Sequence, residues 1–276
     1  MNSYPRRMSR DSKYIIGGGR DGRERLRILS RVMQPSTLPL LSRAGLRPGL
    51  SVLDVACGGG DVACDMASIV GPSGKVVGTD IDEAQLDIAS AEARQLGLDN
   101  IEFRLSNITE EGPGETFDLV HARFILTHLN NPARAVLRMR DALKPGGVLV
   151  LEDIDFSGHF SLPDCPAFEA YQKIYVETAR RRGSDANIGL RLPALMREAG
   201  FEAIQVSVAQ PAGIGGEVKE VASLTLTRIA ESAIETGATT QAVIDEAIKG
   251  LDAFAARPDT LMSIPRIVET WGVRPE

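Results

Sequence analysis

One stretch decides the fold: Val52-Leu53-Asp54-Val55-Ala56-Cys57-Gly58-Gly59-Gly60-Asp61-Val62-Ala63. Its apolar beginning predicts a buried strand, its glycines predict a tight turn, and its last residues predict the start of a helix. Glycine permits a positive φ and lets backbone N–H groups approach a ligand closely. The N-terminus of the following helix adds the positive end of a dipole. The stretch therefore predicts a ligand-binding turn between a strand and a helix.

A second signal follows about 20 residues later, which is the spacing of dinucleotide-binding fingerprints. Val76-Val77-Gly78-Thr79-Asp80 has the pattern of a buried strand that ends in a carboxylate. Asp80 is placed to accept hydrogen bonds from both hydroxyls of a ribose. The two signals together predict a βαβ unit that binds a nucleoside.

NAD is the first ligand to consider, because Gly58, Gly60 and Ala63 satisfy the dinucleotide pattern. Asp54, at the end of the first strand, favours a different ligand. Its carboxylate suits a cationic ammonium group in the crevice and would repel a pyrophosphate. S-adenosylmethionine carries an ammonium and a sulfonium and has no phosphate. The sequence therefore favours S-adenosylmethionine over NAD.

Five motifs occur in order along the chain and together resemble those of class I S-adenosylmethionine-dependent methyltransferases, of the small-molecule type that includes quinone-biosynthesis and natural-product enzymes. The resemblance is dense over residues 46–155. The first motif is the glycine turn, the second the ribose-binding strand end, and the others are three further strands with their flanking turns. The five stretches are residues 54–60, 78–82, 101–108, 117–124 and 143–152.

The resemblance implies an α/β fold with a Rossmann-like, seven-stranded, mostly parallel sheet, helices on both faces, and helical additions at both ends. Strands and helices alternate through the core, which also indicates a parallel sheet. Residues 201–208 and 266–271 would supply the sixth strand and the antiparallel seventh. The implied organisation is an N-terminal helical cap (1–44), an S-adenosylmethionine-binding core (45–160), and the rest of the sheet with a helical insertion (161–276). We expect the first helix, over residues 21–44, to be interrupted before Pro35.

The insertion at 217–256 is helical in pattern, and it would serve either as a packing element or dimer contact or as a lid over the substrate. A homodimer is therefore one expectation.

The resemblance also implies the residues that contact the cofactor. Those of the first motif lie in the glycine turn, those of the second at the ribose, and the others beside the adenine and at the end of the fourth strand. Where the family usually has Asp beside the adenine, this chain has Asn. The implied contacts are Asp54, Ala56, Gly58, Gly60, Asp80, Ile81, Asn107, Ile108, Ala122 and Arg123.

Arg123 has two interpretations. It could anchor the carboxylate of the cofactor or of an acidic acceptor, or it could form an ion pair with Asp153 or Asp155 at the end of the fifth strand. Glu152, Asp153 and Asp155 form a carboxylate cluster there, which would either face the substrate or bond within loops.

Methyl transfer needs mainly an acceptor held in line with the methyl group. A base helps only when the acceptor arrives protonated, and His128, just after the fourth strand, is the candidate base. A packing role for His128 is the alternative. Tyr14, followed by glycines at 17–19, could fold over the site as such tyrosines do in several members of the family; otherwise it anchors the terminus.

Composition agrees with a cytoplasmic enzyme. The 276 residues carry a net charge of −6, which argues against nucleic acid as the default partner. Neither a secretory signal nor an apolar run long enough to span a membrane is evident. The three cysteines lack C-x-x-C spacing and the three histidines do not cluster with them, so we expect no metal site.

The leading prediction is a methyltransferase that moves a methyl group from S-adenosylmethionine to an oxygen, nitrogen or carbon atom of a small organic molecule by in-line displacement. An NAD-dependent oxidoreductase is the rival enzyme. A non-catalytic S-adenosylmethionine-binding protein is the third possibility, because the motifs concern the cofactor alone.

Overall fold

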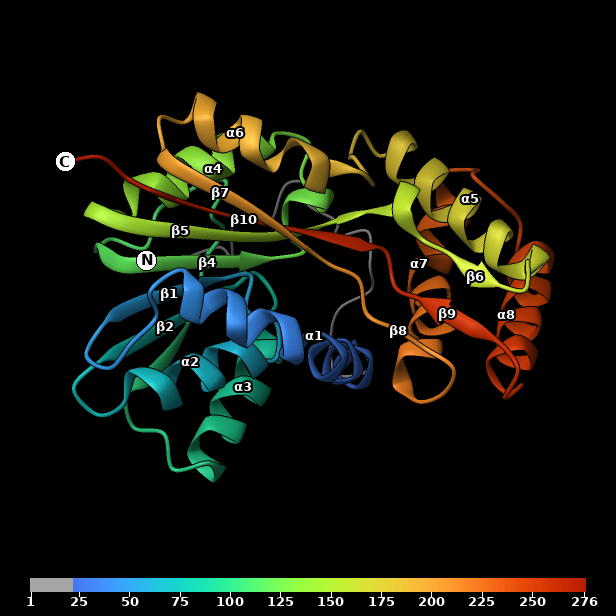
Figure 1. Ribbon diagram of the computed structural model, residues 1–276, viewed down its shortest axis with the longest axis horizontal. Coiled ribbons are helices and arrows are strands. Elements are labelled where there is room, and N and C mark those ends of the chain that lie inside the picture. Colours follow the sequence, from blue (N-terminus) through green and yellow to red (C-terminus); the bar gives the residue numbers. More distant parts are fainter. Residues whose placement is uncertain (1–21) are drawn as a thin grey trace, which may run out of the picture.

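The computed structural model describes residues 22–276 and is built around a seven-stranded sheet of order β3-β2-β1-β4-β5-β10-β7 (Figure 1). Strand β10 runs antiparallel to both of its neighbours, and the remaining pairs are parallel. The predicted seven-stranded, mostly parallel sheet is thus confirmed. Its strands are β1 (Ser51–Val55), β2 (Lys75–Asp80), β3 (Ile101–Leu105), β4 (Phe117–Arg123), β5 (Leu143–Asp155), β7 (Glu202–Ala209) and β10 (Arg266–Val273).

Helices cover both faces of the sheet, and each face has its own apolar cluster. On one face, α2 (Asp61–Val70), α3 (Glu83–Gln95) and the end of α1 pack against β1 and β2. On the other face lie α4 (Pro132–Asp141) and α6 (Leu192–Glu198). Because the central strands are buried from both sides, their sequences are mostly apolar and lack the regular alternation of polar residues that a half-exposed sheet shows.

Helix α1 (Arg23–Arg43) continues through Pro35 and Pro39, so the predicted interruption before Pro35 is wrong. The two prolines remove backbone donors, and Figure 1 shows the helix bent, with its two halves running in different directions. Met33 before the first proline and Leu40 after the second are fully buried. Burial of both halves outweighs the missing hydrogen bonds and keeps the helix whole.

A separate group of elements gathers at one end of the sheet (Figure 1). Helices α5 (Pro166–Arg181), α7 (Val221–Glu235) and α8 (Gln241–Ala255) pack on one another and form the predicted helical addition. Beside them lies a small antiparallel sheet that the sequence did not predict, because its strands are only two or three residues long. Its members are β6 (Ser161–Leu162), β8 (Ala212–Gly213) and β9 (Leu261–Ser263).

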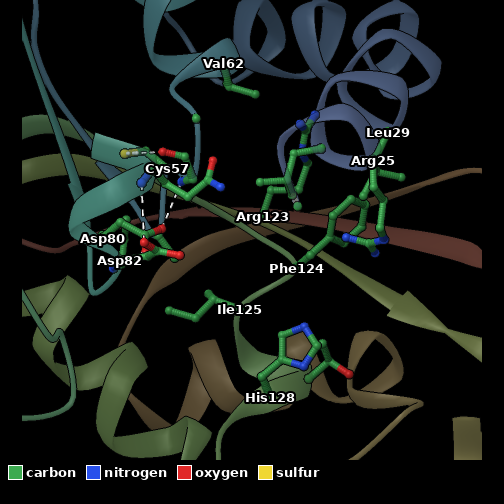
Figure 2. Close-up of a pocket in the computed structure, with 18 of the residues that line it drawn as sticks. Arg25, Leu29, Cys57, Val62, Asp80, Asp82, Arg123, Phe124, Ile125 and His128 are labelled. Atoms are coloured by element: carbon green, nitrogen blue, oxygen red, sulfur yellow. Dashed lines mark hydrogen bonds between the residues drawn. The ribbon is translucent and has the colours of Figure 1, made fainter. Parts of the chain in front are cut away.

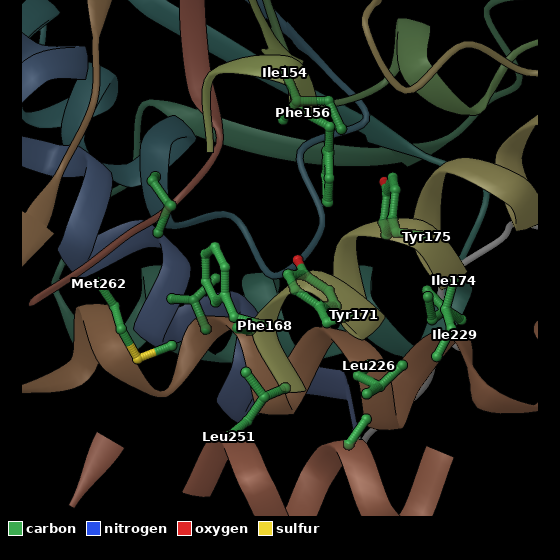
Figure 3. Packing of buried hydrophobic residues seen from close by; sticks show 14 of the residues in the cluster. Ile154, Phe156, Phe168, Tyr171, Ile174, Tyr175, Leu226, Ile229, Leu251 and Met262 are labelled. Carbon is green, nitrogen blue, oxygen red and sulfur yellow. The ribbon is translucent and has the colours of Figure 1, made fainter. Parts of the chain in front are cut away.

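An apolar cluster joins this group to the rest of the chain (Figure 3). Ile28 and Met33 of α1 contact it from one side, and Ile154 and Phe156 contact it from the end of β5. All three predicted segments therefore contribute to one cluster. The division at 44 and 160 stays a prediction. Short 3-10 turns complete the chain: η3 (Leu126–His128), η4 (Phe156–Gly158), η5 (Ile188–Arg191) and η6 (Glu217–Lys219).

The glycine turn yields a prediction about packing. Gly60 has φ +80°, and a Cβ added there would lie 2.8 Å from the Cβ of Ala89 and 2.9 Å from the ring of Phe103. Gly97 has φ +69° and nothing within 4 Å of such an atom. We expect Gly97→Ala to cost about 1 kcal/mol of unfolding free energy for the left-handed backbone alone. Gly60→Ala should cost about 1–3 kcal/mol more, because it also overpacks the core. Chemical denaturation of both variants measures the difference, and equal losses would contradict the packing argument.

Candidate functional site

A pocket of about 500 Å³ lies at the carboxyl ends of β1, β2 and β4, where open α/β sheets bind their ligands (Figure 2). Residues that end or follow these strands line it, together with the first turns of α1 and residues of α5 and α7. Asp80 and Asp82 lie at one end of the pocket, and Arg25 and Phe124 lie at the other (Figure 2). The two ends therefore differ in charge and in chemistry.

Asp80 organises the acidic end of the pocket. One of its carboxylate oxygens accepts a hydrogen bond from the backbone N–H of Gly58 at 2.9 Å, and the other accepts one from Asp82 at 2.9 Å. Burial raises the pKa of Asp80, and these N–H groups oppose that rise by stabilising the charged form. The carboxylate thus ties the glycine turn to the end of β2 and keeps lone pairs for a ligand.

His121, on β4, is the centre of a buried ionic cluster beneath the pocket. Its Nδ1 lies 2.8 Å from a carboxylate oxygen of Asp54, and its Nε2 lies 3.1 Å from one of Glu152. All three side chains are almost completely buried. Burial lowers the pKa of His121, but the two carboxylates more than offset this and raise it to about 9. The imidazole is therefore protonated at neutral pH, and its single positive charge is shared between the two carboxylates.

Arg123 continues the same chain of contacts. Its guanidinium donates to the hydroxyl of Thr37 at 3.0 Å, and that hydroxyl donates to Glu152 at 2.9 Å. Neither Asp153 nor Asp155 is its ion-pair partner, so that alternative is wrong: Asp155 pairs with Arg266. Arg123 lines the pocket with its charge unneutralised by an adjacent carboxylate in the described part of the chain.

The predicted carboxylate cluster at the end of β5 is directed into the protein, and none of its members lines the pocket formed by residues 22–276. Glu152 bonds His121 and Thr37. Asp153 accepts from the backbone of Thr127 and Ile154, and burial raises its pKa to about 7. These carboxylates hold the strand ends in place, and they do not face the space where a substrate would lie.

Most of the predicted cofactor contacts line the pocket. Gly60 and Ala122 do not: Gly60 caps α2 against Ala89 and Phe103, and Ala122 is buried within β4. Asn107 lines the pocket, but its amide oxygen already accepts from the N–H and hydroxyl of Thr109. The predicted residues brought together at the pocket are Asp54, Ala56, Gly58, Asp80, Ile81, Asn107, Ile108, Arg123 and His128.

His128 follows β4 in the chain and lines the pocket, as the sequence suggested. Its affinity for a proton is low, however. Loss of hydration lowers its pKa to about 3, and the positive charge of Arg25 contributes to the decrease. A base this weak gains little by accepting a proton at neutral pH. The arrangement favours the packing interpretation of His128 over the catalytic one.

Two backbone positions beside the pocket are strained. Ala56 follows β1 with φ +57°, and Phe124 follows β4 with φ +58°. Non-glycine residues rarely adopt this conformation, and it persists where the surroundings enforce it, often at ligand sites. At both positions the strained turn carries the chain out of the sheet and along the pocket wall.

Aromatic side chains form the wall at the end opposite Asp80. Phe156 stacks on Tyr175 with ring centroids 4.0 Å apart, and Tyr171 packs against both (Figure 3). These three rings line the pocket with Val221 and Thr225 of α7. The helical addition thus supplies one wall of the cavity.

Tyr14 and the glycines at 17–19 lie outside the described residues. Within residues 22–276, no group of histidine, cysteine, aspartate or glutamate side chains is arranged to hold a metal ion. None of the helices formed by these residues is both long and apolar enough to cross a membrane.

Several residues line the pocket although the sequence analysis did not predict that they would. His121 stands in the middle of a strand, and its position opposite Asp54 depends on the pairing of β1 with β4. Arg25 and the rings of α5 reach the pocket by long-range packing. The one available signal was His121 itself, a titratable residue whose neighbours in the strand, Val120 and Ala122, are apolar and buried.

Comparison with known proteins finds methyltransferases both by family and among individual relatives. The methyltransferase domain family matches residues 46–186, slightly more than half of the chain. A demethylmenaquinone methyltransferase from Lactococcus lactis is 32% identical over 60% of this chain and 71% of its own length. A 37.1 kDa protein of transposon TN4556 from Streptomyces fradiae is 33% identical over 59% of this chain, and the match spans only 46% of that protein.

Among solved structures, phosphoethanolamine N-methyltransferase 2 from Haemonchus contortus, bound to phosphomonomethylethanolamine and S-adenosylhomocysteine, has a TM-score of 0.57 at 17% identity. The match covers 93% of this chain and 59% of that protein. At this identity the likeness concerns the fold alone.

The protonated His121 makes stability depend on pH. Its pKa of about 9 in the folded protein exceeds the ordinary 6.5, so the stabilisation is complete below pH 6.5 and is lost as pH rises through 9. We expect the unfolding free energy of the wild type to fall between pH 7 and 10 by up to about 3 kcal/mol relative to His121→Gln. Denaturation at several pH values measures this.

His159→Gln is the matched control. His159 is also buried, but its pKa is lowered to about 3, so it is neutral throughout this range. Its substitution should shift stability by the same amount at every pH from 7 to 10. A parallel shift for His121→Gln as well would mean that His121 is neutral in the folded protein.

Proposed function

The chain belongs to the methyltransferase domain family, and we propose that it transfers a methyl group from S-adenosylmethionine to a small organic acceptor. The observation that carries this proposal is one continuous pocket, which joins an acidic end at Asp54 and Asp80 to an aromatic end at Phe156 and Tyr175. A cofactor with cationic groups suits the first end, and the apolar part of an acceptor suits the aromatic walls of the second.

We propose that the cofactor lies along the glycine turn. Asp80 would accept the ribose hydroxyls, and Ile81 and Ile108 would flank the adenine. The amino-acid part would lie near Asp54 and Arg123, whose opposite charges suit its ammonium and carboxylate. Gly60 and Ala122 would not contact the cofactor, and they would instead support the residues that form the pocket wall.

In the proposed reaction, an electron pair of the acceptor attacks the methyl carbon, the carbon–sulfur bond breaks, and its electrons stay on sulfur. The products are S-adenosylhomocysteine and the methylated acceptor. The sulfonium is a good leaving group, so the protein acts mainly by holding the two reactants in line. Because His128 has little proton affinity, the proposal favours an acceptor whose nucleophilic atom is already deprotonated.

The aromatic wall supports an acceptor with a ring, since flat apolar faces bind rings by offset stacking and edge contacts. The similarity to a demethylmenaquinone methyltransferase, whose name implies a quinone-derived acceptor, agrees with such a ring.

Calorimetry tests the choice of cofactor. We expect S-adenosylhomocysteine to bind the purified protein and NAD to bind at least a hundredfold more weakly, because Asp54 and Asp80 disfavour a pyrophosphate. Tighter binding of NAD would support the oxidoreductase instead. Labelled S-adenosylmethionine, screened with ring-containing acceptors, distinguishes an enzyme from a non-catalytic binding protein.

A pair of variants tests the role of Asp80. Asp80→Asn should weaken S-adenosylhomocysteine binding at least tenfold, because the amide replaces a charged acceptor of two hydrogen bonds with a neutral one. Asp87→Asn makes the same chemical change on the exposed side of α3 and should leave the affinity unchanged. Calorimetry measures both, and unaltered affinity in Asp80→Asn would contradict the ribose assignment.

A further inference from the structure

Resting on this proposed function, we infer that Arg25 is a specificity-determining residue that binds an anionic group, such as a carboxylate, on the methyl acceptor. Arg25 belongs to the first turn of α1 and lines the pocket. It lies with Phe124 at the end away from Asp80 and Asp82 (Figure 2). The inference follows from three features of this arginine: its lack of a carboxylate partner, its surroundings, and its distance from the cofactor end.

The arginines of α1 around Arg25 are all paired with carboxylates. Arg23 bonds Asp61 and Glu92, Arg27 bonds Glu92, and Arg31 bonds Glu217. Arg25 instead has a long hydrogen bond from its Nε to the hydroxyl of Thr225, at 3.4 Å, and no ion pair within residues 22–276. It is the exception in a helix where the protein otherwise supplies a counter-charge.

The surroundings of Arg25 make an unpaired charge costly. The side chain is half-buried, and the pocket wall around it consists of apolar and aromatic residues such as Leu29, Phe124 and Tyr171. A guanidinium in such a place gains strongly from an anionic partner, because the low dielectric strengthens their attraction. Its charge already acts on the pocket, since it helps to lower the pKa of His128.

The position of Arg25 suits the acceptor better than the cofactor. Asp54, Asp80 and Asp82 line the acidic part of the pocket and would repel an anionic acceptor that entered in the reverse direction. Arg25 would hold the anionic group at the far end and direct the opposite end of the acceptor toward the sulfonium. The cofactor's own carboxylate has Arg123 as a candidate partner nearer the strand ends.

The test compares two probes of nearly identical shape, 4-fluorobenzoate and 4-fluorobenzamide. Both are titrated by fluorine NMR into protein saturated with S-adenosylhomocysteine. We expect the wild type to bind the carboxylate at least tenfold more tightly than the amide. Arg25→Met should remove this preference and leave amide binding within twofold of the wild type. Arg25→Gln, which keeps a donor for Thr225, serves as a second variant that should behave in the same way.

Arg27→Met is the matched control, because Arg27 lies on the same helix and is exposed and paired with Glu92. It should preserve the preference for the carboxylate. Absence of a preference in the wild type, or its persistence in both Arg25 variants, would overturn the inference. Failure of both probes to bind the wild type would also overturn the inference.

A separate measurement excludes the cofactor as the source of the anion. S-adenosylhomocysteine carries a carboxylate and methylthioadenosine does not, so calorimetry with both isolates that contact. We expect Arg25→Met to change neither affinity by more than twofold. A tenfold loss for S-adenosylhomocysteine alone would assign Arg25 to the cofactor and overturn the inference. Failure of the wild type to bind S-adenosylhomocysteine would instead contradict the proposed function.

Discussion

The site depends on a buried cation, His121, held between two buried carboxylates. Asp54 and His121 are direct register partners across β1 and β4, and Glu152 comes from the neighbouring β5. Removing His121 would leave two buried carboxylates without a counter-charge, which costs far more than an exposed ion pair contributes. The hydroxyl of Thr37 attaches α1 to the same cluster. The cluster therefore fixes three strand ends and the covering helix relative to one another.

This fixed arrangement explains how strain is tolerated directly above it. The chain leaves β1 through Ala56 and β4 through Phe124, both with positive φ. Such conformations cost about 1–3 kcal/mol each and persist only when the surrounding contacts determine them. Here the residues before each turn, Asp54 and Arg123, are anchored through the cluster and through Thr37. The pocket wall is thus held open by contacts that lie beneath it.

The core of the fold was predictable from sequence because its signals are local. The glycine turn, the strand ending at Asp80 and the alternating elements each lie within a short stretch, and their order specified the sheet. The small sheet was missed because strands of two or three residues have no periodicity to detect. The continuity of α1 across Pro35 was missed because it results from burial of Met33 and Leu40 against distant elements. Arg25 and the aromatic wall likewise reach the pocket only through packing between α1, α5 and α7.

The same packing sets the electrostatics that methyl transfer requires. When an anionic nucleophile attacks a sulfonium, opposite charges are neutralised, so water, which stabilises the separated charges, opposes the reaction. A pocket walled by Phe124, Phe156 and Tyr171 removes that opposition by excluding water from the reacting atoms. A strong cation next to the nucleophile would slow the reaction as water does, because it would stabilise the anion before the reaction. A charge placed at the far end, as Arg25 is, can bind an acceptor through a group that takes no part in the reaction. If Arg25 binds the acceptor as proposed, the separation of acidic, apolar and basic regions along one cavity would let the protein select an acceptor without lowering its reactivity.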